Sequence, residues 1–468
     1  MASEATLADL QLQMNQDQEV LGGWDAVMNL LESAVNEFFQ SQWNAQTSSS
    51  GGKMEISGVW CEGIVPSPPS GQITVVTQYD IQLGSPLFQF QNGQDNVTVT
   101  QQILGGTLKQ GSMSVQQSFQ PASCGCQVND GRVTWGSPVA IDTTQNPVLS
   151  GTVALAQVQG LVNSTTQSLI LDFASGSFTV NNMTIKGVDN TQFVDEIKNW
   201  FNANNIKYIL ASVDFRNLAS LPALTPTSFQ FHVTTTNAGN TIVQLLITTD
   251  GSTPASAQIN VDEPIPTADG LTCSLMISSR ILFSDILANG FNASGNGFQL
   301  IPAVPGGPSP CWYAYINPEF VFAGSFSFGS CCDRTTVTYS IPLGGNFTGS
   351  SAGGFHLAQS ENTQGNVQVN ISVSADYPVT LSGIGASQVI TITPGAPTVT
   401  VTGSAEEEIQ SQLQSILNTD FVSAMSGIRF APVTLFALEN LVFPGNLIQM
   451  SQARVPGDLL IVGVFQTT

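Results

Sequence analysis

The most informative segment of this chain is GGWDAVMNLLESAVNEFF, which spans Gly22–Phe39. A helix would place the apolar residues at positions 24, 27, 28, 31, 35, 38 and 39 along one face. Because the Gly22-Gly23 pair marks a break before this pattern, the segment predicts an amphipathic helix over residues 25–43. From about residue 55 to residue 400 the sequence is typical of strands. A helix with such an apolar face needs a sheet to pack against, and the two together enclose either a protein core or a lipid.

Composition and charge limit what the protein can do. The chain has 468 residues, of which 42% are hydrophobic and only 9% are charged. The net charge of −22 comes from 33 acidic residues against 11 Lys and Arg. Binding to nucleic acid is excluded, because neutralising phosphates needs clustered cations. Adsorption to an anionic membrane through a basic patch is also disfavoured, so any contact with lipid should use apolar surface.

The sequence gives no sign of a membrane span or of a leader. The first five residues, Met-Ala-Ser-Glu-Ala, lack a basic region and an apolar region, so no signal peptide is predicted. There is no run of ~18 apolar residues, and no transmembrane segment is expected. The localisation that follows is either cytoplasmic or export by a non-classical route.

Two further helices are predicted, with a shorter one near the start of the chain. The first covers residues 191–204, with Thr191 as its cap and an apolar face that includes Phe193 and Ile197. The second covers residues 404–426 and begins at a capping-box pattern, Ser-Ala-Glu-Glu. Its buried stripe consists of Ile409, Leu413, Ile416 and Leu417. A weaker amphipathic piece is predicted at 7–14.

Between these helices the hydrophobic period changes to two. Alternating valine and isoleucine residues at 367–373, and valines at 399 and 401, predict antiparallel strands with one buried face. Asn92-Gly93, Asp130-Gly131 and Asp250-Gly251 are typical of hairpin turns. The fold class is therefore α+β with long antiparallel sheets. The helix spacing suggests two modules, at residues 1–212 and 213–468.

Residues with catalytic or metal-binding chemistry are sparse. The chain has two histidines, and His356 follows a G-x-S-x-G match at 349–353 that lies in a Gly/Ser-rich loop rather than on a strand-to-helix turn. The cysteine clusters at 124–126 and 331–332 lack the spacing of a common zinc site, and ordinary thiols are favoured over a disulfide or a metal site. We expect no enzyme activity, no metal and no cofactor.

Motifs at the two ends of the chain carry a family resemblance. Gly23-Trp24-Asp25, followed by Val35-Asn36, stands near the start, and the segments 437–446 (ALENLVFPGN) and 453–463 (ARVPGDLLIVG) stand near the end. Together they resemble the 47-kDa accessory proteins encoded beside clostridial neurotoxin genes. That family resembles the tubular lipid-binding (TULIP) superfamily, which includes the bactericidal permeability-increasing protein.

The resemblance implies long helices wrapped by strongly bent antiparallel sheets, forming a tube with an apolar seam that binds lipid or another hydrophobic ligand. It also implies protein partners in a toxin complex. The candidate seam residues are Trp24, Val27, Met28, Leu31, Val35, Phe38, Phe39, Ile409, Leu413, Ile416 and Leu417. With so few cations, a neutral or zwitterionic ligand is expected. Two alternatives stay open: an interaction protein of the same fold with a filled core, and a β-rich carbohydrate binder or glycosidase.

Overall fold

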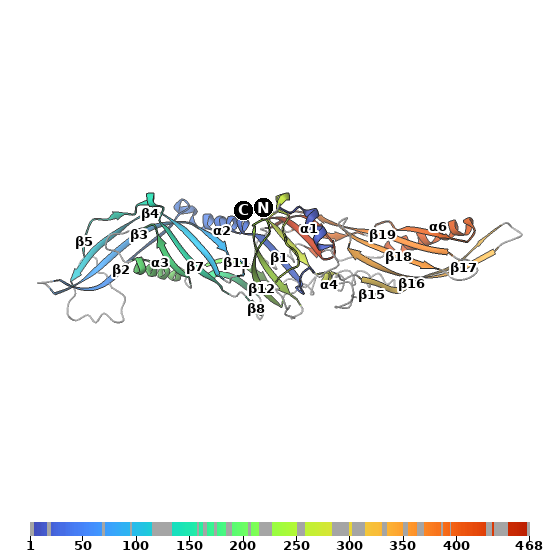
Figure 1. The fold of residues 1–468 in the computed structure, drawn as a ribbon, viewed down its shortest axis with the longest axis horizontal. Helices are drawn as coiled ribbons and strands as arrows, with labels where there is room; N and C mark the ends of the chain where they lie inside the picture. Colours follow the sequence, from blue (N-terminus) through green and yellow to red (C-terminus); the bar gives the residue numbers. More distant parts are fainter. Residues whose placement is uncertain are drawn as a thin grey trace. The chain divides into compact units, whose positions relative to one another are not determined.

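The chain folds into two compact units that are not continuous in sequence (Figure 1). The computed structural model describes residues 4–15, 20–67, 71–93, 96–114, 133–156, 159–161, 166–172, 176–183, 190–204, 207–214, 227–249, 258–282, 299–301, 314–329, 335–349, 354–362, 369–384, 387–393, 395–426, 433–434 and 448–465. Unit 1 contains residues 1–31, 159–167 and 211–466, and unit 2 contains residues 32–158 and 168–210. The modules predicted at 1–212 and 213–468 differ from these units chiefly at residues 1–31, which the structure places with unit 1.

In its described residues, unit 2 consists of one sheet with two α-helices. Among the described residues its sheet has nine strands, in the order β11-β9-β7-β4-β3-β2, with β10 paired to β7 and with β5 and β6 paired to β4. The strands are β2 (Met54–Ser67), β3 (Gly71–Phe90), β4 (Asn96–Ser114), β5 (Val133–Trp135), β6 (Val139–Ala140), β7 (Val148–Ala156), β9 (Thr166–Asp172), β10 (Ser177–Asn181) and β11 (Lys207–Asp214). The helices are α2 (Glu32–Thr47), which contacts β3, and α3 (Asn190–Ala203), which contacts β2 and β10.

Unit 1 contains a sheet that joins both ends of the chain. Its order is β23-β24-β14-β1-β13-β12-β8, seven strands within the described residues. They are β1 (Ala26–Leu31), β8 (Gln159–Leu161), β12 (Ser228–Thr235), β13 (Thr241–Thr248), β14 (Cys273–Ile277), β23 (Ile448–Arg454) and β24 (Leu459–Phe465). Helix α1 (Leu7–Met14) covers one face, and the short helix α4 (Ser279–Ile281) follows β14.

A second sheet in unit 1 has eight strands within the described part of the chain. Its order is β15-β16-β17-β18-β19-β20-β22, with β21 paired to β19. They are β15 (Gln299–Ile301), β16 (Ala314–Phe328), β17 (Thr335–Gly349), β18 (Gly354–Asn362), β19 (Val369–Ser382), β20 (Val389–Ile392), β21 (Thr398–Gly403) and β22 (Val433–Thr434). Helix α6 (Glu407–Ser426) contacts β21 and β16. The predicted α+β class with antiparallel sheets is confirmed.

The helix predicted over residues 25–43 is wrong in its first half. Ala26–Leu31 is strand β1, and the helix begins only at Glu32 and continues to Thr47. The strand lies between β13 and β14, with Asn29 opposite Gln244 on one side and Ser274 on the other. Since both faces of β1 are buried, apolar residues point to both of them, and Asn29 is the one polar residue of the strand. A short apolar run of this kind fits a helix and a doubly buried strand equally well.

The other predicted elements are found with shifted ends. The piece predicted at 7–14 is α1, which begins with a capping box between Thr6 and Asp9. The helix predicted at 191–204 begins one residue earlier, so Thr191 lies inside its first turn. The helix predicted at 404–426 begins at Glu407, after the expected cap.

The alternation predicted for strands is confirmed where the structure describes it. In β19 and β21 the valines at 369, 373, 399 and 401 are buried, and their neighbours at 370, 372, 398 and 400 are exposed. Asn92-Gly93 forms the turn between β3 and β4. The turns predicted at 130–131 and 250–251, the cysteine pairs at 124–126 and 331–332, and the whole end motif at 437–446 lie outside the described residues.

Candidate functional site

The predicted seam residues are distributed over three places, two in unit 1 and one in unit 2. Trp24 and Val27 lie in a core cluster between α1 and the seven-stranded sheet, and Leu31 packs against this cluster at its margin. Leu10 and Met14 of α1 belong to the same cluster and pack over this face of the sheet. Met28 of strand β1 is also buried but is not a member of this cluster. The cluster consists of Leu7, Leu10, Met14, Val20, Leu21, Trp24, Val27, Ile242, Leu246, Val261, Ile265, Leu271, Met276, Leu460 and Val462. These side chains are packed against protein atoms, as in an ordinary core.

A row of polar side chains crosses this sheet within the same core. Gln244 donates through Nε2 to Asn29 Oδ1 at 2.7 Å, and Asn29 Nδ2 donates to Ser274 Oγ at 3.1 Å. Ser274 in turn donates to the Pro264 carbonyl at 2.5 Å. All three side chains are buried, and each is opposite its partner in the strand register. The row fixes the register of three neighbouring strands, because a shift by one residue would leave buried amides unpaired.

The second place is the interface between α2 and β3 in unit 2. Val35, Phe38 and Phe39 are buried there, and the rings of Phe39 and Phe88 lie 4.5 Å apart between centroids. The Asn36 side chain pairs with the Phe88 backbone in both directions: Nδ2 donates to the carbonyl at 2.8 Å, and Oδ1 accepts from the amide at 2.8 Å.

Glu32 continues the same contact one helical turn earlier. Its Oε2 accepts from the Phe90 amide at 2.9 Å. Burial raises the pKa of the Glu32 carboxyl, and this hydrogen bond opposes the rise in part. Since the pairing of β2 with β3 begins at Met54 opposite Leu83, the stretch of β3 near Phe88 lies beyond the end of β2. Side chains of α2 therefore supply the hydrogen bonds that a neighbouring strand would make there.

Unit 2 also contains an aromatic group against α3. Phe193 lies 5.9 Å from Trp60 and 6.0 Å from Tyr79 between ring centroids, and all three are buried. Glycine makes room for the Tyr79 ring: Gly58 is opposite Tyr79 in the register, and a Cβ at Gly58 would overlap the Tyr79 ring. Two buried polar atoms near the first turn of α3, Trp60 Nε1 and Gln192 Oε1, have no hydrogen-bond partner among the described residues. A donor and an acceptor thus stand unpaired in a largely apolar interior, an arrangement that is costly unless a ligand or water pairs with them.

The electrostatics of this group come from acids on the same helix. Burial, and then the neighbouring Asp195, raise the pKa of the Glu196 carboxyl. Burial and the charge of Glu196 raise the pKa of Tyr79 to about 12. The Tyr79 hydroxyl is therefore neutral at physiological pH, and it is suited to hydrogen bonding rather than to proton transfer.

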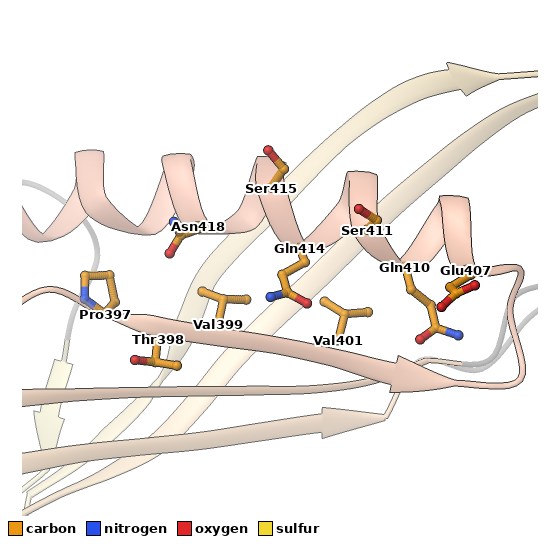
Figure 2. Close-up of a pocket in the computed structure, with 10 residues that line it drawn as sticks. All are labelled: Pro397, Thr398, Val399, Val401, Glu407, Gln410, Ser411, Gln414, Ser415 and Asn418. Atoms are coloured by element: carbon orange, nitrogen blue, oxygen red, sulfur yellow. The ribbon is translucent and has the colours of Figure 1, made fainter.

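The third place is α6 in unit 1. Ile409, Leu413 and Leu417 are buried, whereas Ile416 is half-buried. On another side of the helix, polar residues line a groove of about 560 Å³ between α6 and β21, shown in Figure 2. The structure brings neither the α2 nor the β1 seam residues into this groove.

The two end motifs meet in unit 1 at the turn after β14. Asp25 of the first motif is buried and forms an ion pair with Arg280, and its Oδ2 accepts from the Thr249 amide at 2.7 Å. Asp458 of the second motif accepts from the Ser279 amide at 2.6 Å. The sequence did not predict a role for Arg280 or Ser279, because no local pattern distinguishes them from other polar residues.

Chemistry that needs clustered ligands is not seen in the described residues. No group of three His, Cys, Asp or Glu side chains there could hold a metal ion. Cys273 is a free, fully buried thiol whose pKa is raised by burial. Within the described ranges, none of the helices has the length and apolar character needed to cross a bilayer.

The fold is that of an α+β protein in which amphipathic helices pack on antiparallel sheets in two units. The chain is similar to P47 from Clostridium botulinum A2, with 13% sequence identity, a TM-score of 0.53 and coverage of 96% of this chain and 99% of that one. It is also similar to P47 of Clostridium botulinum E1, with 11% identity, a TM-score of 0.52 and coverage of 95% and 99%. A lipopolysaccharide binding protein aligns over 95% and 99% of the two chains with 10% identity and a TM-score of 0.34. No family model and no curated protein sequence matches the chain.

The resemblance predicted from the end motifs is confirmed at the level of the fold. At these identities the likeness extends to the fold and not to a shared ligand. The ligand contacts predicted for the eleven seam residues stay a prediction.

Proposed function

We propose that this chain is a non-enzymatic protein that binds a lipid or another hydrophobic ligand between the helices and the sheet of unit 2. The observation that carries the proposal is the unpaired donor Trp60 Nε1 and the unpaired acceptor Gln192 Oε1 in that interior. A ligand with a hydroxyl or an amide group would pair with such atoms, while its apolar part would lie among the aromatic rings.

The chemistry of the interior favours a ligand without multiple negative charges. Each CH₂ group removed from water contributes about 0.8 kcal/mol, so an acyl chain supplies most of the affinity. Gln192 and Trp60 offer neutral hydrogen bonds, and the carboxylates of Asp195 and Glu196 on the same helix would repel an anionic headgroup. A neutral or zwitterionic ligand fits best.

Native mass spectrometry, followed by organic extraction of the purified protein, tests the proposal. The wild-type chain should carry an extractable lipid of neutral or zwitterionic type, and Trp60→Phe should lower its occupancy because the indole donor is gone. Trp43→Phe is the matched control, since Trp43 Nε1 already donates to the Gly52 carbonyl at 3.1 Å. The control should cost about 1 kcal/mol of stability and leave occupancy unchanged.

A filled core is the second candidate, and it is favoured by the burial of Val35, Phe38, Phe39, Phe193 and Phe201. The chain would then act as an interaction protein, with components of a toxin assembly as the partners that the family resemblance suggests. An empty protein that also fails to bind fluorescent fatty acid or phospholipid supports this candidate. In that case Trp60→Phe should be neutral or stabilising, because it removes an unpaired buried donor.

A further inference from the structure

The groove between α6 and β21 has the features of a site for an extended polypeptide. Strand β21 pairs with β19 and with no other strand in the described part of the chain. Its sequence, Thr-Val-Thr-Val-Thr-Gly, has high β-propensity and carries no charge that would protect the edge. A free edge of this kind presents unpaired backbone amides and carbonyls to another strand.

Helix α6 runs along this edge and presents amide side chains toward it. Gln410, Gln414 and Asn418 line the groove at intervals of four residues, with Val399 and Val401 across from them (Figure 2). Four helical residues rise about 6.0 Å, close to the ~6.7 Å between every second residue of a strand. The amides of Gln414 and Asn418, together with the Gln410 Oε1 acceptor, can therefore meet the outward-facing backbone groups of one added strand.

The dimensions of helix and strand also agree. From Glu407 to Asn418 the helix rises about 16.5 Å, and Thr398–Gly403 extends for about the same length. The groove therefore accommodates roughly six extended residues.

At two other places in this chain an amide side chain makes the pair of backbone hydrogen bonds that a neighbouring strand would make. Gln388 donates to the Met450 carbonyl at 2.7 Å and accepts from the Met450 amide at 3.1 Å. Asn36 forms the same pair of bonds with Phe88. At the groove, Gln410 already donates to the carbonyls of Gly403 and Ala405 at one end.

The lining selects among ligand classes. None of the ten lining residues is aromatic, so there is no platform on which a sugar ring could stack, and polar side chains outnumber apolar ones, which disfavours an acyl chain. Among the described lining residues only Glu407 is charged, and it lies in the first turn of α6 beside the exposed Glu406 and Glu408. Three carboxylates at one end are complementary to a basic residue.

We propose that the groove binds an extended segment of another protein, which adds a strand to the β21 edge. The segment has uncharged residues along the amides of α6 and a Lys or Arg at the Glu407 end. This proposal is independent of the ligand proposed for unit 2.

Fluorescence anisotropy with the intact protein and a labelled peptide tests the assignment. The probe is Lys-Lys-Val-Asn-Ile-Ser-Val-Ser, whose last six residues copy Val369–Ser374, the segment of β19 that pairs with β21. Saturable binding is expected, and Gln414→Ala should weaken it about two- to tenfold, the effect of one or two lost hydrogen bonds. Gln412→Ala is the matched control, because Gln412 is on the same helix and does not line the groove.

Two changes to the probe peptide separate the contribution of backbone pairing with β21 from that of the charge pairing at the Glu407 end. Two N-methylated peptides are compared, one methylated at the odd positions and one at the even positions. Binding should be abolished in the peptide whose methyl groups replace the N–H groups that pair with β21, and it should be kept in the other. Replacing the lysines with glutamates should weaken binding, and Glu407→Gln should reduce the difference between the two probes. The proposal is overturned by equal binding of the N-methylated peptides in both registers, by equal effects of the two glutamine variants, or by no saturable binding at millimolar probe. A dimer in sedimentation velocity that Gln414→Ala dissociates, without peptide binding, would assign the groove to a second copy instead.

Discussion

Asp25 links three separate segments of unit 1 through its carboxylate and its backbone. The carboxylate pairs with Arg280 and accepts from Thr249, while the Asp25 amide donates to Ile247 at 2.9 Å and its carbonyl accepts from Ser278 at 2.9 Å. The side chain is 2% exposed, whereas that of Arg280 is 31% exposed. The residue therefore holds the start of β1 against the ends of β13 and β14, which gives the Gly-Trp-Asp motif a structural role.

Replacing Asp25 with Asn should destabilise unit 1 by about 3 kcal/mol, near the lower end of the range for breaking a buried ion pair. The lower end applies because the partly exposed Arg280 can turn toward water. Urea unfolding should show the loss, with Asp262→Asn as the control because Asp262 is exposed. Equal stability of the two variants would remove Asp25 from this role.

Glu32 predicts a pH dependence whose sign follows from burial. Its pKa is raised above the ordinary value of 4.5, so the folded state holds the proton at a pH where the unfolded state has lost it. Its contribution to stability is therefore present at low pH and is lost as the pH rises through the folded-state pKa.

Glu32→Gln cannot titrate, and its amide oxygen still accepts from Phe90. The variant should therefore gain stability relative to wild type between about pH 4 and pH 7. Urea unfolding at the two pH values measures this, with the exposed Glu37→Gln on the same helix as the control. A constant difference between Glu32→Gln and wild type across this range would contradict the prediction.

At the scale of the elements, α2 closes the edge of β3 through one amide. Asn36→Ala would leave the Phe88 amide and carbonyl without these partners, so we expect a loss of about 1–3 kcal/mol. Hydrogen exchange of the Phe88 amide should accelerate in the variant. Asn204→Ala is the control, because Asn204 is exposed at the end of α3 and bonds only within that helix among the contacts described. Unchanged protection of Phe88 would mean that the sheet edge is closed by other contacts.

Sequence patterns predicted the elements with clear periodicity and failed where burial is two-sided. Helix α3 and strand β21 each have one wet face, so their periods are visible in the sequence. Strand β1 has no solvent-exposed face. Its polar residue, Asn29, is hydrogen-bonded to Gln244 and Ser274, which are more than 200 residues away in the sequence. The ion pair between Asp25 and Arg280 could not be predicted for the same reason, because the two residues are far apart in the sequence. The groove between α6 and β21 could not be predicted either, since polar residues on a helix usually form a solvated face.

At the scale of the whole molecule, the seven-stranded sheet of unit 1 needs both ends of the chain. Strand β1 pairs with β13 and β14, and β14 pairs with β24, which ends at Phe465. Unit 2 instead joins β2, β3 and β4 as sequential antiparallel neighbours. Closing a long loop costs more conformational entropy than forming a hairpin, and contacts between distant residues form more slowly.

Refolding of the full chain should therefore protect the amides of unit 2 before those that join β1 to its neighbours. Pulse-labelled hydrogen exchange would follow Val76 and Val99 in unit 2 against Met28 and Leu460 in unit 1. The hairpin of β12 and β13 provides a control inside unit 1, because it is local in sequence and should be protected early although its sheet is completed late. If Met28 is protected together with Val76, the two units fold as one cooperative structure, and the long loop does not limit the rate.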